Sequence, residues 1–163
     1  MIRIYRISTP KVIVLLAAML FQMSIAFAFV QTPRNHGAGG DNDGPLLQEY
    51  RSVRINMTTE EVRKKLNNPS DKGDEQDFFV FGDNENAQVF YDKTHKVFAI
   101  SVNFLAGAHD MPTAKAVFGS DISAKPDGSM YKMVRYPKAG YWVSFSRTAG
   151  DSPLTTVTLQ RIE

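Results

Sequence analysis

Hydrophobic and polar positions alternate most clearly in the middle of the chain, from Val97 to Phe104 (VFAISVNF). One side of this stretch holds Phe98, Ile100, Val102 and Phe104, and the other holds Ala99, Ser101 and Asn103. A period of two predicts a half-buried strand of an antiparallel sheet. Shorter apolar or alternating runs, separated by turn residues, predict five further strands at 77–81, 87–91, 130–136, 141–147 and 154–162.

Two helices are expected ahead of the first strands. In Leu46 to Ile55 (LLQEYRSVRI), the apolar residues at 46, 47, 50 and 53 follow the period of an amphipathic helix. After a break, Thr58 can cap a second helix, and Glu61 three residues later completes a capping box. Asn67-Asn68-Pro69 ends this helix. The pattern therefore predicts a helix hairpin packed on an antiparallel β-meander.

The same order of elements recurs in the second half of the chain. Met111-Pro112-Thr113 resembles Met57-Thr58-Thr59, which lies 54 residues earlier, and 114–118 can form one short helix before three more strands. We therefore expect an α+β fold of two tandem helix-plus-three-strand units, 46–104 and 105–163. Chance similarity between two α+β halves is the alternative, because the identities are few.

The first 28 residues have the features of a secretory signal peptide. Three basic residues precede the apolar run Val12 to Leu20, and Ala26-Phe27-Ala28 supplies small residues for cleavage. Residues 29–45, rich in Gly, Asn, Asp and Pro, are expected to form a flexible linker. The sequence thus predicts a periplasmic or secreted protein. The alternative is an uncleaved N-terminal anchor, through which alone the protein would contact a membrane.

The excess of basic residues belongs to that N-terminal segment. The chain carries 19 Lys+Arg and 17 Asp+Glu, a net charge of +2. Without Arg3, Arg6 and Lys11, 16 basic and 17 acidic residues are left, a net charge of −1. A near-neutral chain without a long basic stretch argues against a nucleic-acid partner.

Residues that could carry catalysis or hold a metal are scarce. The absence of cysteine excludes disulfides, cysteine-ligated metal centres and a cysteine nucleophile. His36, His95 and His109 stand apart from any catalytic motif. Acidic residues cluster in a predicted solvated loop, for which a weak metal site or a small exported hydrolase is the alternative: Asp71, Asp74, Glu75 and Asp77. We expect no enzyme activity, no cofactor and no metal.

The segment from Val53 to Pro69 resembles a family motif. It reads VRINMTTEEV, then LNNP after three residues, and is similar to the I-x-x-G-M-T-x-x-x-V-x-x-x-L-G-x-P pattern of the BamE-like family, which includes a small outer-membrane assembly lipoprotein. The double arrangement of helix and sheet resembles the secreted β-lactamase inhibitory proteins. The resemblance implies a fold and no chemistry.

This sequence departs from the family pattern at three points. Asn56 and Asn67 replace the two family glycines, and asparagine is the next best residue at a left-handed backbone position. We therefore expect the fold to survive both changes. The lipoprotein cysteine is missing, which implies that this chain is not lipid-anchored as the assembly factor is.

Aromatic residues on an open sheet face are the main functional lead. In Tyr141 to Arg147, alternation assigns Tyr141, Val143 and Phe145 to the core, and Trp142, Ser144 and Ser146 to the open face. Trp142 is a candidate partner-binding residue because tryptophan is frequent in binding hot spots. Phe79 and Phe81, or else Phe78 and Val80, are expected to face away from the helices as well. The alternative is that the linker or a loop covers Trp142.

These observations predict a non-enzymatic protein-binding module of the bacterial cell envelope, with a role in envelope assembly or as an inhibitor. Its protein partner is unidentified. A small exported hydrolase and a structural envelope protein held by an uncleaved anchor are the alternatives.

Overall fold

The computed structural model describes residues 44–163, which belong to one compact unit, Gly40–Glu163. The expected signal peptide, nearly all of the expected linker, and His36 lie outside the described residues. The described part of the chain forms two short helices and seven strands. They are α1 (Thr59–Leu66), β1 (Asp71–Lys72), β2 (Gln76–Gly82), β3 (Glu85–Tyr91), β4 (Val97–Phe104), α2 (Ala114–Phe118), β5 (Met130–Tyr136), β6 (Tyr141–Arg147) and β7 (Thr155–Arg161).

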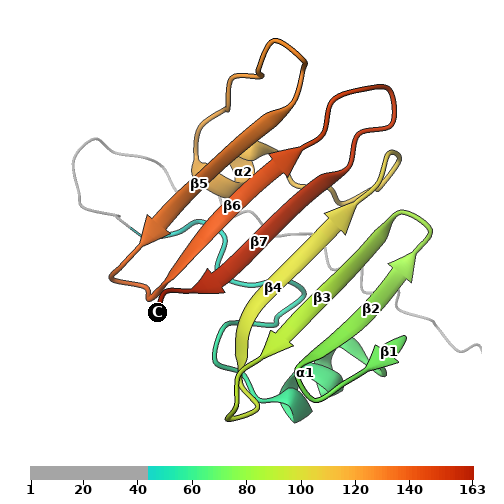
Figure 1. Cartoon of the computed structure of the whole chain (residues 1–163), viewed down its shortest axis with the longest axis vertical. Coiled ribbons are helices and arrows are strands. Elements are labelled where there is room, and N and C mark those ends of the chain that lie inside the picture. Colours follow the sequence, from blue (N-terminus) through green and yellow to red (C-terminus); the bar gives the residue numbers. More distant parts are fainter. Residues whose placement is uncertain (1–43) are drawn as a thin grey trace, which may run out of the picture. The chain divides into compact units, whose positions relative to one another are not determined.

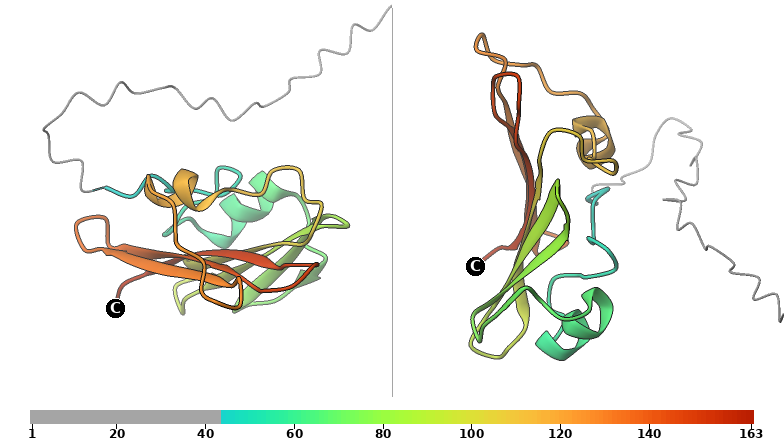
Figure 2. Two further views of the ribbon diagram at one scale, coloured as in Figure 1. Left: turned by 90° about the horizontal axis from the view of Figure 1, so that it is seen from above. Right: turned by 90° about the vertical axis from the view of Figure 1, so that its right-hand side faces the viewer.

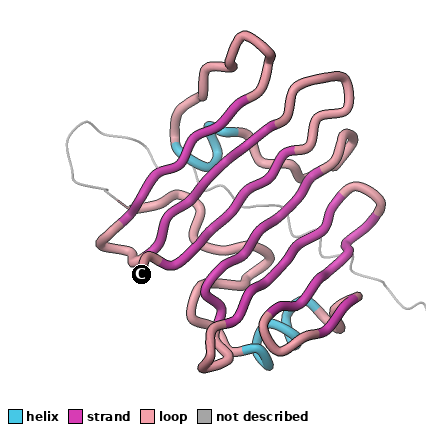
Figure 3. The backbone as a smooth tube through the Cα atoms, viewed as in Figure 1, coloured by secondary structure: helices cyan, strands magenta, loops and turns pink. Residues whose placement is uncertain are grey.

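The strands join in a single antiparallel sheet with the order β1-β2-β3-β4-β7-β6-β5 (Figure 1). The chain runs outward to inward in each half, so that the last strand of each meander lies at the centre (Figure 3). There β4 pairs with β7, and Ile100 lies opposite Leu159 while Val102 lies opposite Val157.

Both helices and the segment that precedes α1 lie on the same face of the sheet (Figure 2). We call this the covered face. Every second strand residue points into it and packs against Val62 and Leu66 of α1 and Val117 of α2. The sheet contributes to this core chiefly Phe79, Val89, Ile100, Val102, Val143, Val157 and Leu159. Within 44–163, no helix has the length and apolar character needed to cross a membrane.

The predicted fold class is wrong. The helices have only eight and five residues, and the domain is mainly a seven-stranded sheet rather than a helix hairpin on a meander. The two expected tandem units also share one sheet through the β4–β7 pair. Most strand boundaries agree with the sequence prediction, but local periodicity carries no information about which distant strands pair.

The predicted helix over 46–55 is replaced by an irregular segment with a tight turn. Tyr50 and Val53 exchange backbone hydrogen bonds, N to O at 2.9 Å and 2.8 Å, and both residues between them, Arg51 and Ser52, have positive φ (46° and 64°). This is the arrangement of a type I′ hairpin turn. A ten-residue helix is marginal by itself, whereas the turn brings Val53 into the core, where it is fully buried.

The capping box of the second predicted helix is confirmed. The Thr58 hydroxyl accepts from the Glu61 amide at 3.3 Å, and the Glu61 carboxylate accepts from the Thr58 amide at 2.8 Å. Asn56 and Asn67, at the positions of the family glycines, have positive φ of 71° and 67°. The expectation that asparagine tolerates these backbone positions is therefore confirmed.

One residue of the alternating stretch 97–104 lies on the other side of the sheet from the one expected. The pairing of β3 with β4 is irregular at Phe90 and Tyr91, with Tyr91 opposite Val97 and Phe90 opposite Ala99. This bulge shifts the alternation by one residue. Val97 is buried in the core, and the Phe98 ring lies instead 6.1 Å from that of Phe90.

Candidate functional site

The face of the sheet opposite the helices is free of helices and loops throughout the described region (Figure 2). We call it the uncovered face. Strand register and burial place three side chains of each of the strands β2 to β7 on it, eighteen in all. They form three rows across the sheet. The end row comprises Gln76, Phe90, Ala99, Gln160, Trp142 and Arg135, the middle row Phe78, Gln88, Ser101, Thr158, Ser144 and Met133, and the far row Val80, Asn86, Asn103, Thr156, Ser146 and Tyr131.

The composition of the uncovered face is unusual for a protein surface. Arg135 on the edge strand β5 is the one charged side chain among the eighteen. A soluble surface is about 25–35% charged, which would give about five such residues. On the central strands β3, β4, β7 and β6, the outward positions are instead mostly amides and hydroxyls. The face can therefore form many hydrogen bonds and carries almost no charge.

Side chains of neighbouring strands are linked by hydrogen bonds across this polar centre. Thr156 Oγ1 donates to Asn103 Oδ1 at 2.8 Å, and Asn103 Nδ2 donates to Asn86 Oδ1 at 3.0 Å. The hydroxyls of Ser101 and Thr158 lie 3.2 Å apart. Each amide has two N–H donors and an oxygen with two lone pairs, so these bonds orient the groups and leave capacity for a ligand.

Aromatic side chains gather at one end of the uncovered face. Trp142 on β6 lies in the end row with Phe90 on β3, and the Phe98 ring packs beside Phe90. A groove of about 550 Å³ adjoins them, with Phe90 and Phe98 on its wall and the β3–β4 turn and the C-terminal residues around it. Across the groove mouth, Arg161 Nη2 donates to Asp92 Oδ2 at 2.8 Å. Hydrogen bonds from Thr94 and Arg161 hold the pKa of Asp92 well below its usual range.

The predicted binding residues divide between the two faces. Trp142, Ser144 and Ser146 point to the uncovered face and Tyr141, Val143 and Phe145 are buried, so the predicted orientation of this strand is confirmed. Phe79, by contrast, is 2% exposed and belongs to the core, and Phe81 lies on the same covered face. The pair that points to the uncovered face is Phe78 and Val80. The structure thus does not bring Phe79 or Phe81 together with Trp142.

Phe81 takes part in a cluster with the tight turn that replaces the first predicted helix. The Arg51 guanidinium carbon lies 4.4 Å from the Phe81 ring centroid, a cation–π distance. Its Nη2 donates to both carboxylate oxygens of Glu85 at 3.0 Å. The Tyr50 hydroxyl also donates to Glu85, and burial together with this carboxylate raises the pKa of Tyr50 strongly. The cluster anchors the turn to β2 and β3.

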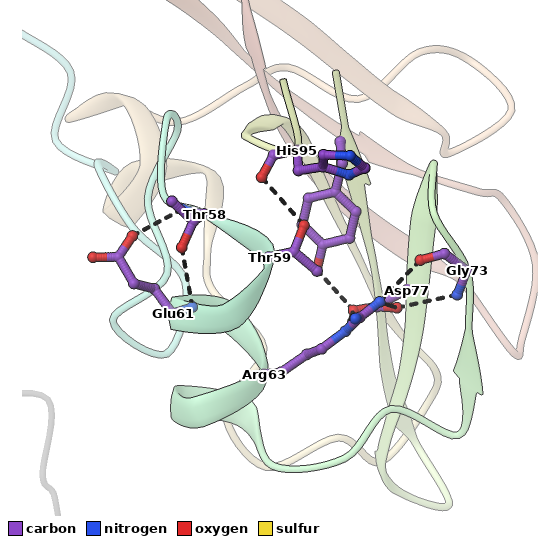
Figure 4. Close-up of polar contacts among 8 residues, drawn as sticks. Thr58, Thr59, Glu61, Arg63, Gly73, Asp77 and His95 are labelled. Carbon is purple, nitrogen blue, oxygen red and sulfur yellow. Dashed lines mark hydrogen bonds and ion pairs between the residues drawn. The ribbon is translucent and has the colours of Figure 1, made fainter. Parts of the chain in front are cut away.

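The acidic loop residues do not converge on a catalytic pair. Asp77 is fully buried and accepts from Arg63 Nε and Nη2, both at 2.8 Å, from the Tyr91 hydroxyl at 2.8 Å and from the Gly73 amide at 3.2 Å (Figure 4). Burial raises the pKa of Asp77, but the bonds from Arg63, Tyr91 and Gly73 outweigh it, and the pKa lies below its usual value. A general acid needs the opposite shift.

The remaining predicted site residues are exposed. Asp71, Asp74 and Glu75 point to solvent around β1. His95 lies in the exposed β3–β4 turn, where its backbone oxygen accepts from the amide of Thr59 at 3.0 Å, and His109 lies in the exposed connection before α2. These side chains are spread over separate loops.

Comparisons with known proteins add little to this picture. No family model matches the chain, and no curated protein matches it. The chain is similar to the solved structure of a DUF4309 family protein (YjgB) from Bacillus subtilis subsp. subtilis str. 168, at 15% sequence identity and a TM-score of 0.47, over 71% of this chain and 86% of that one. A similarity at this TM-score carries no argument, and the BamE-like resemblance stays a prediction.

Proposed function

We propose that this chain is a non-enzymatic, exported binding module of the bacterial cell envelope, periplasmic or secreted, which presents its uncovered sheet face to a partner. The observation that carries the proposal is the composition of that face, with one charged side chain among eighteen. A face with no function except solubility would carry charges. Export is supported by the signal-peptide features of residues 1–28.

A protein partner is supported by a small apolar patch at the margin of the face. Tyr131 and Met133 on the edge strand β5 are 56% and 45% exposed, and Trp142 lies on the neighbouring strand β6. Aromatic residues and methionine are enriched in protein interfaces. A protein is accordingly the second candidate for the partner, besides the class argued below.

Site-specific photo-crosslinking in intact envelopes tests the proposal. A diazirine amino acid at Ser144, in the middle row of the uncovered face, should yield an envelope adduct. The same group at Lys64, which is exposed on α1 on the opposite side of the sheet, is the matched control. Equal adducts at the two positions, or none at either, would contradict the proposal. Sequencing of the mature N-terminus and fractionation test export separately.

A further inference from the structure

We infer that the uncovered face binds a neutral glycan chain laid across the strands. The inference rests on the proposed function and names its partner class. It starts from the distribution of polar and apolar groups on the face: amides and hydroxyls fill the central strands, and aromatic or aliphatic side chains lie mostly toward its margins, at Phe78, Val80, Phe90, Phe98, Tyr131, Met133 and Trp142.

This distribution is the reverse of a protein–protein interface. Such interfaces have an apolar, desolvated core and a polar rim. Here Ser144, Thr158 and Ser101 lie side by side in the centre of the face, and the exposed apolar groups lie on the flanking strands. A protein or a second copy of this chain would have to desolvate a polar centre to reach the apolar margin.

The absence of charge from the centre selects against ionic ligands. A bound carboxylate or phosphate there would lose its hydration and meet no counter-charge, since Arg135 lies on the edge strand. A neutral chain of sugars offers what the face can pair with. Its hydroxyls are donors and acceptors at once, as are the amides of Asn86, Gln88, Asn103 and Gln160 and the hydroxyls between them.

The aromatic side chains set the length and direction of the ligand. Phe90 and Trp142 occupy the end row on β3 and β6, which are separated by β4 and β7. Three inter-strand spacings of about 4.8 Å put them roughly 14 Å apart. The C–H faces of sugar rings pack on aromatic rings through dispersion contacts. A chain of several sugars running across the strands would contact both rings and cross the polar centre between them.

A titration of the uniformly ¹⁵N-labelled domain with two neutral probes, β-1,4-linked glucose and N-acetylglucosamine hexamers, tests the inference. We expect at least one hexamer to shift amide resonances of β4, β6 and β7, and a hexamer of galacturonic acid to shift none. Trp142→Ala should weaken binding about tenfold or more, as for a hot-spot residue. Leu105→Ala removes a similarly exposed apolar side chain outside the face and should bind as the wild type does.

A second variant keeps the test valid if Trp142→Ala folds poorly. Thr158→Glu adds a charge at the exposed centre of the face and should also abolish hexamer binding, with its fold checked by circular dichroism. If neither neutral hexamer shifts the spectrum but a protein adduct forms specifically at position 144, the glycan inference is overturned and the proposed function stands. Concentration-dependent shifts of the face without any sugar would assign it to a second copy instead. Absence of both hexamer binding and adduct overturns both.

Discussion

At the scale of single residues, Asp77 is the clearest case of a charge used for architecture. Its carboxylate is buried and receives hydrogen bonds from α1, from β3 and from the loop that precedes β2 (Figure 4). The bidentate contact of Arg63 is the strongest kind of charge-assisted pairing. A single carboxylate thus joins three separate parts of the covered face, and its low pKa is a consequence of that role.

Replacing Asp77 should destabilise the domain in a pH-dependent way. Asp77→Asn leaves Arg63 without its counter-charge. Because the Arg63 side chain is 24% exposed and can be partly rehydrated, we expect a loss of about 2–3 kcal/mol at pH 7, below the range for a fully buried pair. Urea unfolding measures it. Asp74→Asn, at an exposed neighbouring position, should change stability by less than about 0.5 kcal/mol.

The sign of the pH effect follows from the lowered pKa. A carboxyl group whose pKa is lower in the folded state contributes stability above its unfolded value, near 3.8 for Asp77, and loses it as the pH falls through the folded value. The difference between wild type and Asp77→Asn should therefore be largest near pH 7 and shrink below about pH 4. A difference that is constant down to pH 2 would exclude an ionised Asp77.

Ser52 is expected to be a site of backbone strain. It has a φ of 64° in the type I′ turn, where a residue with a Cβ atom is disfavoured by roughly 1–2 kcal/mol relative to its normal conformation. Glycine removes this strain but loses more entropy on folding. Ser52→Gly should raise the free energy of unfolding by about 0.5–1 kcal/mol. Ser123→Gly, in an exposed loop without positive φ, should lower it slightly. Equal effects would contradict the assignment.

At the scale of elements, α1 depends on its cap. An eight-residue helix is too short to be stable by itself, so it relies on packing and on the satisfied amides of its first turn. Thr58→Ala removes the hydroxyl that accepts from Glu61 and should cost about 1 kcal/mol in thermal or urea unfolding. Lys64→Ala, exposed on the same helix, should be neutral within about 0.5 kcal/mol. A neutral Thr58→Ala would mean that packing alone holds α1.

The sequence predicted elements with clear periodicity and missed those that depend on partners. Six strands were identified to within about two residues because alternation is a property of the strand itself. The tight turn at Arg51-Ser52 was missed because neither residue signals positive φ, and β1 because Asp71-Lys72 shows no pattern. The bulge that moves Phe98 depends on the pairing of β3 with β4, which no local pattern reveals.

The candidate site shows the same division. The orientation of Trp142 followed from alternation within one strand. The choice between Phe79 and Phe78 did not, since every residue from Phe78 to Phe81 is apolar and either set could face the core. The uncharged character of the uncovered face emerges only when six strands are placed in register, because its eighteen residues are scattered from Gln76 to Gln160.

At the scale of the whole molecule, the β4–β7 pair decides whether the two halves unfold together. It joins two meanders that are local in sequence, and its core residues, Ile100, Val102, Val157 and Leu159, are almost fully buried. If this junction is as strong as its burial indicates, the described domain should behave as one cooperative unit. Two independent tandem units would instead unfold separately.

The single tryptophan provides a direct measurement. Trp142 lies on β6, whereas Leu66 lies on α1 and is 6% exposed. Leu66→Ala should cost about 2–5 kcal/mol, as for other buried leucines. In a cooperative domain, the urea midpoint from Trp142 fluorescence should fall together with the midpoint from far-ultraviolet circular dichroism. A Trp142 transition unmoved by Leu66→Ala would show that β5–β7 stay folded when α1 is lost, and that the shared sheet does not couple the halves.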